Sequence, residues 1–120
     1  MHVKRLELMP SGMGFEVYIR QAVRQRYPSN ARYKIYEQYP VSGVGVLDFY
    51  VVRERERIVI DAKDKGKLAM SDIGQVDYYA RELSATERII YIANDTRVPD
   101  SVKEEADRLA IQITRTQYRT

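Results

Sequence analysis

Apolar residues recur at helical spacing in three stretches of the chain, and each stretch predicts an amphipathic helix. The first covers residues 11–27, with Ser11 as a candidate N-cap, and the second covers residues 71–83. The third covers residues 101–110 and opens with the Ser-x-x-Glu spacing of a capping box. These helices separate stretches with the shorter period of β-strands.

Strand patterns fill most of the remaining chain. Residues 32–39 alternate loosely, are rich in tyrosine and are followed by Pro40, which we expect to stop the strand. Residues 41–45 then predict a flexible joint. Within residues 87–93 a continuous apolar run indicates a strand buried on both faces, and residues 111–114 alternate as a last strand.

Residues 46–63 contain two β-rich runs joined by a charged connector, which predicts a β-hairpin. If Glu54-Arg55 is its turn, the antiparallel register places Asp48 directly opposite Asp61. Because side chains alternate along a strand, Lys63 then lies on the same face as Asp61. The order of elements, α-β-β-β-α-β-α-β, predicts a three-layer α/β domain with a mixed sheet.

Length and composition narrow the classes of protein. The chain has 120 residues, 44% hydrophobic and 31% charged, which suits a single globular domain over residues 1–120. It contains no apolar run of the roughly 20 residues that span a bilayer and no signal-peptide pattern, so we expect a cytoplasmic protein that does not enter membranes. The absence of cysteine and the single His2 exclude disulfide scaffolds, thiolate metal sites and histidine-built zinc sites.

The net charge of +3, the pI of about 9.2 and the ten tyrosines suit a polyanionic partner. Arginine and tyrosine are suited to phosphate contact and base stacking. The same residues are also typical of an ordinary charged surface and an ordinary core, so composition alone does not decide between them.

Two opposed acids on a half-buried sheet face need a physical reason. An ion pair between Asp61 and Lys63 at the strand end is one reading, and it explains a single acid well. It explains two opposed acids less well, because like charges repel across a strand pair. A divalent cation between Asp48 and Asp61 removes that repulsion, and oxygen ligands favour Mg²⁺ or Mn²⁺ over zinc.

These residues fall into a motif set. Asp48, twelve intervening residues and then residues 61–63 (Asp-Ala-Lys) resemble the D…(D/E)xK signature of the PD-(D/E)xK nuclease superfamily. Residues 14–16 (Gly-Phe-Glu) resemble its GxE motif. Residues 75–79 resemble the QxxxY motif of the RecB-like branch, and archaeal Holliday-junction resolvases are similar. The resemblance spans about residues 12–115 and implies a three-layer restriction-endonuclease-like fold with an αβββαβ core.

Two positions depart from the superfamily pattern. Leu47 stands where proline often precedes the first acid. Asp61 stands where glutamate is commoner, which shortens the reach of the carboxylate by one methylene.

The resemblance implies a metal-dependent mechanism. Asp48, Asp61 and the backbone carbonyl of Ala62 would hold Mg²⁺, and Glu16 would touch the metal directly or through water. The metal would polarise the scissile phosphate and lower the pKa of a bound water. Lys63 would orient or deprotonate that water, or stabilise charge on the phosphorane.

Further residues have two readings each. Gln75 would position Lys63 or the substrate backbone, and Tyr79, on the same helix face, would support it or contact nucleic acid. Alternatively, both residues simply pack the flank of their helix on the sheet. Lys65 and Lys67 are candidate phosphate contacts in the loop after the strand, and an ordinary solvated loop is the other reading.

The sequence therefore predicts a Mg²⁺-dependent nuclease acting on DNA, with RNA not excluded, of a structure-specific resolvase, repair or restriction type. We expect no separate recognition domain, so specificity would come from substrate structure, a partner or a homodimer. The alternative is a non-catalytic nucleic-acid-binding or assembly module on a nuclease fold. A third reading, an α/β domain with an incidental ion pair, requires all four motif matches to be accidental.

Overall fold

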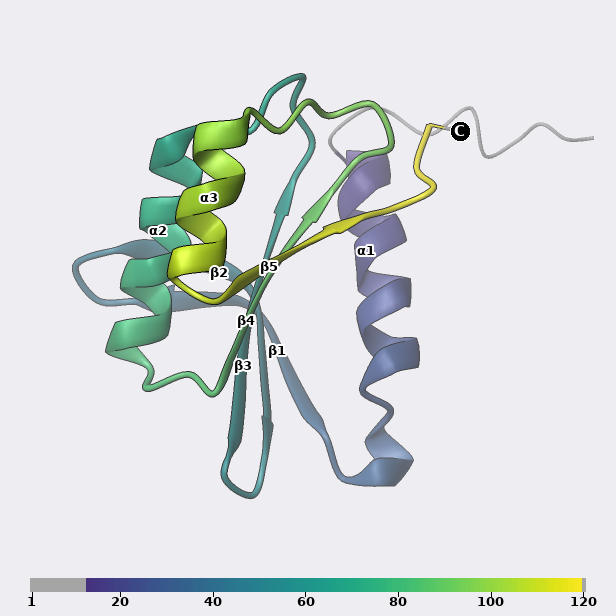
Figure 1. Ribbon diagram of the computed structural model, residues 1–120. Helices are drawn as coiled ribbons and strands as arrows, with labels where there is room; N and C mark the ends of the chain where they lie inside the picture. The colour runs from purple at the N-terminus through teal and green to yellow at the C-terminus, as the bar shows by residue number, and fades with distance from the viewer. Residues whose placement is uncertain (1–12, 120) are drawn as a thin grey trace, which may run out of the picture.

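In the computed structural model, which describes residues 13–119, a five-stranded sheet carries one helix on one face and two on the other (Figure 1). The elements are α1 (Met13–Arg26), the short 3-10 helix η2 (Ser29–Ala31), β1 (Lys34–Val41), β2 (Gly45–Arg53), β3 (Glu56–Lys63), α2 (Met70–Glu82), β4 (Glu87–Ile92), α3 (Asp100–Arg108) and β5 (Ile111–Arg115). The predicted N-cap Ser11 and the single histidine, His2, lie outside the described residues.

The strand order is β1-β2-β3-β4-β5, antiparallel from β1 to β3 and parallel from β3 to β5. This mixed sheet between two helical layers confirms the predicted fold class. The apolar run in β4 is buried from Ile89 to Ile92, because both of its neighbours are parallel strands and both faces are covered. None of the described helices has the length and apolar character needed to cross a membrane.

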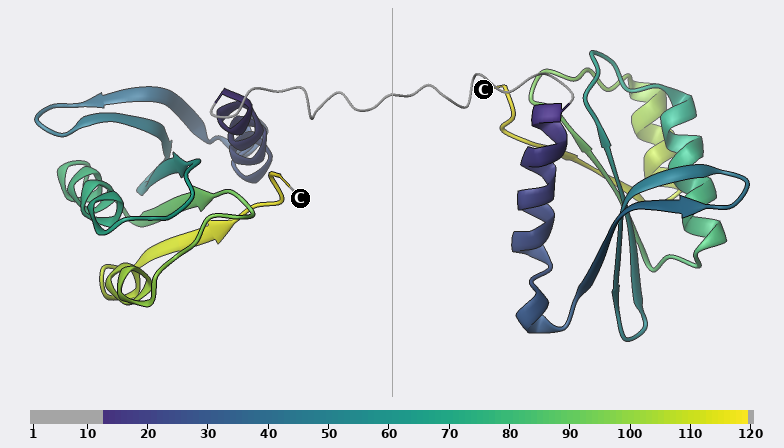
Figure 2. Two further views of the ribbon diagram at one scale, coloured as in Figure 1. Left: turned by 90° about the horizontal axis from the view of Figure 1, so that it is seen from above. Right: turned by 180° about the vertical axis from the view of Figure 1, so that it is seen from behind.

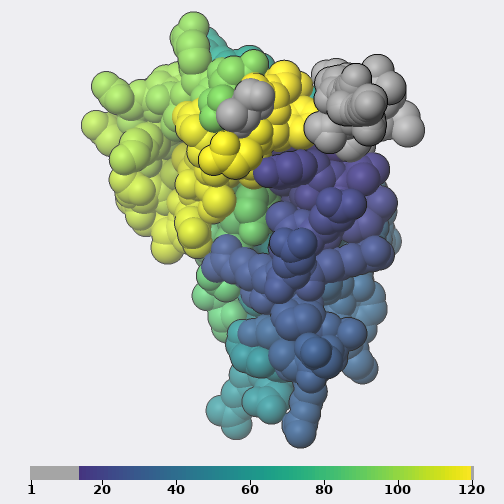
Figure 3. All heavy atoms as spheres, turned by 90° about the vertical axis from the view of Figure 1, so that its right-hand side faces the viewer, coloured from purple at the N-terminus to yellow at the C-terminus, as the bar shows by residue number. Residues whose placement is uncertain are grey.

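The apolar stripe of α1 packs on one face of the sheet, where Phe15, Ile19 and Val23 meet Phe49 and Ile60. The C-terminal tail closes the end of this layer, since the Tyr118 ring lies 5.1 Å from the Phe15 ring (Figure 3). The opposite face is covered by α2 and α3 (Figure 2), whose apolar residues form a second core.

The hairpin of β2 and β3 has the predicted register. Glu54 and Arg55 form its turn, Arg53 pairs with Glu56, and the ladder continues to Phe49 and Ile60. Beyond that pair the two strands diverge. β2 keeps β1 as its partner as far as Gly45, and β3 keeps β4 as far as Lys63. The two strands thus form a fork immediately beyond Phe49 and Ile60.

A bend in the β1–β2 pair accounts for the fork. Gln38 has a left-handed backbone with φ of 52°, and the ladder skips Gln38 and Asp48. After the bend, the Tyr39 ring lies on the same side as the Tyr36 ring, at 5.8 Å, although regular alternation would put them on opposite faces. The end of the β1–β2 hairpin, around residues 41–45, therefore leaves the plane of the sheet and passes across α2 (Figure 2).

Three details differ from the sequence prediction. Pro40 does not stop the strand, because β1 is an edge strand in which proline is tolerated, and Pro40 pairs with Val46. The expected flexible joint at 41–45 is a tight hairpin turn closed by the Val44 N–H and the Val41 carbonyl, at 3.0 Å. Helix α3 begins at Asp100 after Pro99 with no side-chain cap, so the capping box predicted there is wrong.

Candidate functional site

Asp48, Asp61 and Lys63 meet at the fork, on the face of the sheet that α2 covers. The Lys63 Nζ lies 2.9 Å from Asp61 Oδ2 and donates a hydrogen bond of 2.9 Å to Gln75 Oε1 on α2. Asp48 Oδ2 accepts a hydrogen bond of 2.8 Å from the Ala62 N–H. The divergence of β2 and β3 thus creates a position where a carboxylate of one strand bonds directly to the backbone of the other.

The two carboxyl groups strongly affect each other. Asp61 is 3% exposed, and burial raises its pKa from 3.8 to about 7, with the charge of Asp48 and a hydrogen bond to Asp48 acting in the same direction. Lys63 opposes this rise. Without a cation, Lys63 and, below about pH 7, a bound proton therefore relieve the repulsion between these two neighbouring acids.

Lys63 is held by partners on two elements. Besides Asp61 and Gln75, it has Asp72 Oδ1 at 3.8 Å. Burial alone would lower the pKa of Lys63, but Asp61, Asp72 and Asp48 together raise it. The side chain is therefore an ammonium group with a fixed direction.

Gln75 is in turn fixed by a hydrogen-bonded chain. Its Nε2 donates to the Tyr79 hydroxyl at 3.2 Å, and that hydroxyl donates to the Val46 carbonyl at 3.0 Å. Tyr79 is fully buried, so the expectation that it contacts nucleic acid is wrong. Its hydroxyl instead ties α2 to β2 and supports Gln75.

Asp72 was not recognised from the sequence, although it has two functions in the site. This buried carboxylate accepts the Ala69 N–H at 2.7 Å, which caps the start of α2, and pairs with Lys65 Nζ at 2.9 Å. An acid in the first turn of a predicted helix was the available signal. Its link to the lysines depends on the loop that brings Lys65 back toward α2.

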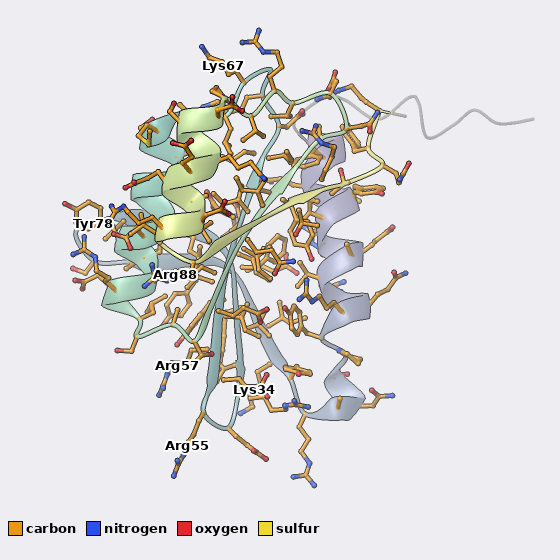
Figure 4. The ribbon with its side chains drawn as sticks, viewed as in Figure 1. Lys34, Arg55, Arg57, Lys67, Tyr78 and Arg88 are labelled. Atoms are coloured by element: carbon orange, nitrogen blue, oxygen red, sulfur yellow. The ribbon has the colours of Figure 1, made fainter. Side chains whose placement is uncertain are left out.

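The remaining predicted residues lie farther out. Glu16 is exposed on α1, which packs on the opposite face of the sheet from Lys63, and its contact with a metal stays a prediction. Lys65 is bound to Asp72, and Lys67 extends outward from the loop at one end of the sheet (Figure 4). Their contacts with phosphate also stay predictions.

The donor set fits a magnesium ion. Among residues 13–119, no three His, Cys, Asp or Glu side chains gather into a metal site. Mg²⁺, however, is commonly held by one or two carboxylates together with waters and substrate phosphates. The hydrogen-bonded carboxyl pair of Asp48 and Asp61, with the raised pKa of Asp61, is a group that a divalent cation would stabilise by replacing the proton.

A separate cavity of about 480 Å³ opens beside the C-terminal end of α1, lined by Arg24, Tyr27, Pro28, Ser29, Asn30, Tyr33 and Ile35. It contains none of the predicted site residues.

No family model and no curated protein match this sequence. Solved structures do match its fold. SfsA of Pyrococcus furiosus, solved with Ca²⁺, has a TM-score of 0.55 at 15% identity over 88% of this chain and 55% of its own. A repair endonuclease of Pyrococcus abyssi has a TM-score of 0.57 at 19% identity, over 84% of this chain and 46% of its own.

A third similar structure is Can2 of Sulfobacillus thermosulfidooxidans with cyclic tetra-adenylate, with a TM-score of 0.62 at 17% identity over 86% of this chain and 33% of its own. The chain has the restriction-endonuclease-like fold. The resemblance to the PD-(D/E)xK superfamily is thus confirmed as a resemblance of fold. The chain spans between 33% and 55% of the length of these three structures.

Proposed function

We propose that this chain is a Mg²⁺-dependent nuclease that hydrolyses phosphodiester bonds of DNA. The observation that carries the proposal is the convergence of Asp48, Asp61 and Lys63 at the fork, where Asp48 Oδ2 accepts the Ala62 N–H at 2.8 Å and Lys63 Nζ lies 2.9 Å from Asp61 Oδ2. The restriction-endonuclease-like fold supports it. A structure-specific substrate, of resolvase or repair type, is the form of the activity that we favour.

In this proposal Asp48, Asp61 and the carbonyl of Ala62 hold Mg²⁺, with Mn²⁺ as a substitute. We also propose that Glu16, exposed near the start of α1, contributes to the metal site through water. When bound, the ion would supply Lewis-acid polarisation of the scissile phosphate.

Lys63 donates a hydrogen bond to the attacking water or to a phosphate oxygen on which charge develops. Its ammonium group is held in one direction by Asp61 and Gln75, which reduces the reorganisation needed during reaction. Gln75 is a positioning residue supported by Tyr79. Lys65 and Lys67 would contact phosphates on either side of the scissile bond.

The proposal includes a cytoplasmic location and a homodimer, since two sites related by a twofold axis can cut two strands. RNA is a weaker candidate substrate than DNA.

The test is a survey of labelled duplex, single-stranded, flap and four-way-junction DNA, incubated with Mg²⁺, with Mn²⁺ and with EDTA. We expect metal-dependent cleavage of at least one substrate, and loss of that cleavage in Asp48→Ala. No cleavage with either metal would overturn the proposal. Tight binding without cleavage would instead favour the non-catalytic binding module.

A further inference from the structure

Three tyrosine rings form a strip on the α2 side of β1 and β2. The ring centroids of Tyr36 and Tyr39 are 5.8 Å apart, those of Tyr39 and Tyr50 are 4.9 Å apart, and those of Tyr36 and Tyr50 are 6.2 Å apart. Tyr50 is buried, whereas Tyr36 is 44% exposed on the edge strand. The strip therefore ends in an aromatic ring that is open to solvent and supported by two others.

The strip begins next to the candidate site. Tyr50 and Asp48 are two residues apart on one face of β2, which is about 7 Å along a strand. Tyr36 lies directly opposite Tyr50 in the register. Between Tyr36 and the site, the exposed Gln38 side chain reaches Asp48 Oδ1 at 3.5 Å. A chain lying across Tyr36 would thus be directed toward the two carboxyl groups.

The other end of the strip is basic. Lys34 pairs with Val52 and Val52 with Arg57, so Lys34 and Arg57 share the face of Tyr36, one row farther from the site. Neither cation forms an ion pair with any residue between 13 and 119. Both lie toward the end of the sheet opposite to Lys67 (Figure 4).

We propose that this strip binds a single-stranded segment of nucleic acid beside the scissile phosphate. One base stacks on the Tyr36 ring, and Lys34 and Arg57 contact the phosphates that follow it. Aromatic rings beside unpaired cations are the combination that holds single strands, since a base in a duplex already has stacked neighbours on both faces. Cleavage of the bound strand beside Asp48 rests on the proposed function, whereas the binding of the strand does not.

The absence of tryptophan from the chain provides a direct test. Tyr36→Trp introduces a single indole whose emission is quenched when a base stacks on it. The probe is a single-stranded oligothymidylate, compared with a blunt duplex of the same length, both in EDTA so that cleavage plays no part. Val17→Trp, on an exposed position of α1 across the sheet, is the matched control.

We expect saturable quenching of Tyr36→Trp by the single strand, little quenching by the duplex and none in Val17→Trp. Tyr36→Phe should bind the single strand like wild type, whereas Tyr36→Leu should bind about tenfold to a hundredfold more weakly, the loss expected for one stacked base. Lys34→Gln should reduce the slope of log affinity against log salt by about 0.7.

Three results would overturn the inference. These are a Tyr36→Trp emission that the single strand does not change, a Tyr36→Leu affinity equal to that of Tyr36→Phe, and equal quenching by single strand and duplex. Binding in EDTA and cleavage in Mg²⁺ are separate readouts. A protein that binds through Tyr36 but does not cut would leave this inference standing and reject the nuclease proposal.

Discussion

Asp61 is the residue whose ionisation is most altered by folding at the candidate site. Its pKa is raised from 3.8 to about 7, first by burial and then by Asp48. Between about pH 4 and pH 7 the folded metal-free protein therefore keeps a proton on Asp61 that the unfolded chain releases. The stability that this proton gives is fully present below about pH 4 and is lost as the pH rises through 7.

We therefore predict that metal-free wild type loses stability between pH 5 and pH 8 relative to Asp61→Asn, by on the order of 2 kcal/mol. Asparagine cannot ionise, so its contribution stays constant. The measurement is the free energy of unfolding by urea in EDTA at several pH values. Parallel curves for the two proteins would contradict the raised pKa.

Metal binding should show the opposite pH dependence. A cation between Asp48 and Asp61 must displace the proton, so we predict that Mg²⁺ or Mn²⁺ raises the melting temperature more at pH 8 than at pH 6. The shift should disappear when EDTA is added and should be absent in Asp61→Asn. An equal shift in wild type and Asp61→Asn would place the metal elsewhere.

Asp72 combines a helix cap with a lysine contact, and two substitutions separate these roles. Asp72→Asn keeps an oxygen for the Ala69 N–H but loses the charge beside Lys65, whereas Asp72→Ala loses both. We predict that Asp72→Ala is less stable than Asp72→Asn by about 1 kcal/mol in urea unfolding. Equal midpoints would mean that the cap does not contribute.

At the scale of single residues, the sequence predicted the positions that follow from strand alternation. Lys63 shares the face of Asp61 by strand alternation, and the two-residue turn brings Asp48 close to them, although the ladder ends at Phe49 and Ile60, one pair short of the predicted pairing of Asp48 with Asp61. Asp72 and the burial of Tyr79 depend on contacts between segments distant in the sequence, so local periodicity could not predict them.

The end of the β1–β2 hairpin is the element that completes the site, and Gly45 allows its close approach to α2. Gly45 has φ of +149°, and a Cβ there would lie 3.0 Å from the Tyr79 hydroxyl oxygen. We predict that Gly45→Ala lowers the free energy of unfolding by about 1–2 kcal/mol.

Two further variants test the cause. Gly45→Ala should cost less free energy of unfolding in a Tyr79→Phe background than in the wild type, because the hydroxyl that the Cβ meets is removed. Gly74→Ala on α2, where a Cβ meets nothing within 4 Å, should instead stabilise the helix by up to about 1 kcal/mol. An equal effect of Gly45→Ala and Gly74→Ala would contradict the proposed contact.

The elements themselves were predicted to within a few residues, because their periods are clear and charged or proline-containing turns separate them. The bend at Gln38 was not predicted, since glutamine carries no signal for a left-handed backbone. That bend is the feature that separates β2 from β3 and opens the fork.

At the scale of the whole molecule, the sheet divides into two parts with different tasks. Strands β3 and β4 form the covered interior, with β5 as one edge of the sheet, and the antiparallel pair of β1 and β2 brings the bent, partly exposed opposite edge to the site. The order of elements was sufficient to predict the three layers. The side of the sheet on which each helix lies was not predictable from that order alone.

The most direct test of the central claim is the single-turnover rate of DNA cleavage by Lys63→Ala at saturating Mg²⁺. Lys103→Ala, on the exposed surface of α3, is the matched control for loss of one positive charge. We predict that Lys63→Ala lowers the rate constant by about a hundredfold or more while Lys103→Ala leaves it unchanged. A Lys63→Ala rate equal to that of Lys103→Ala would contradict the assignment of this fork as a hydrolytic centre.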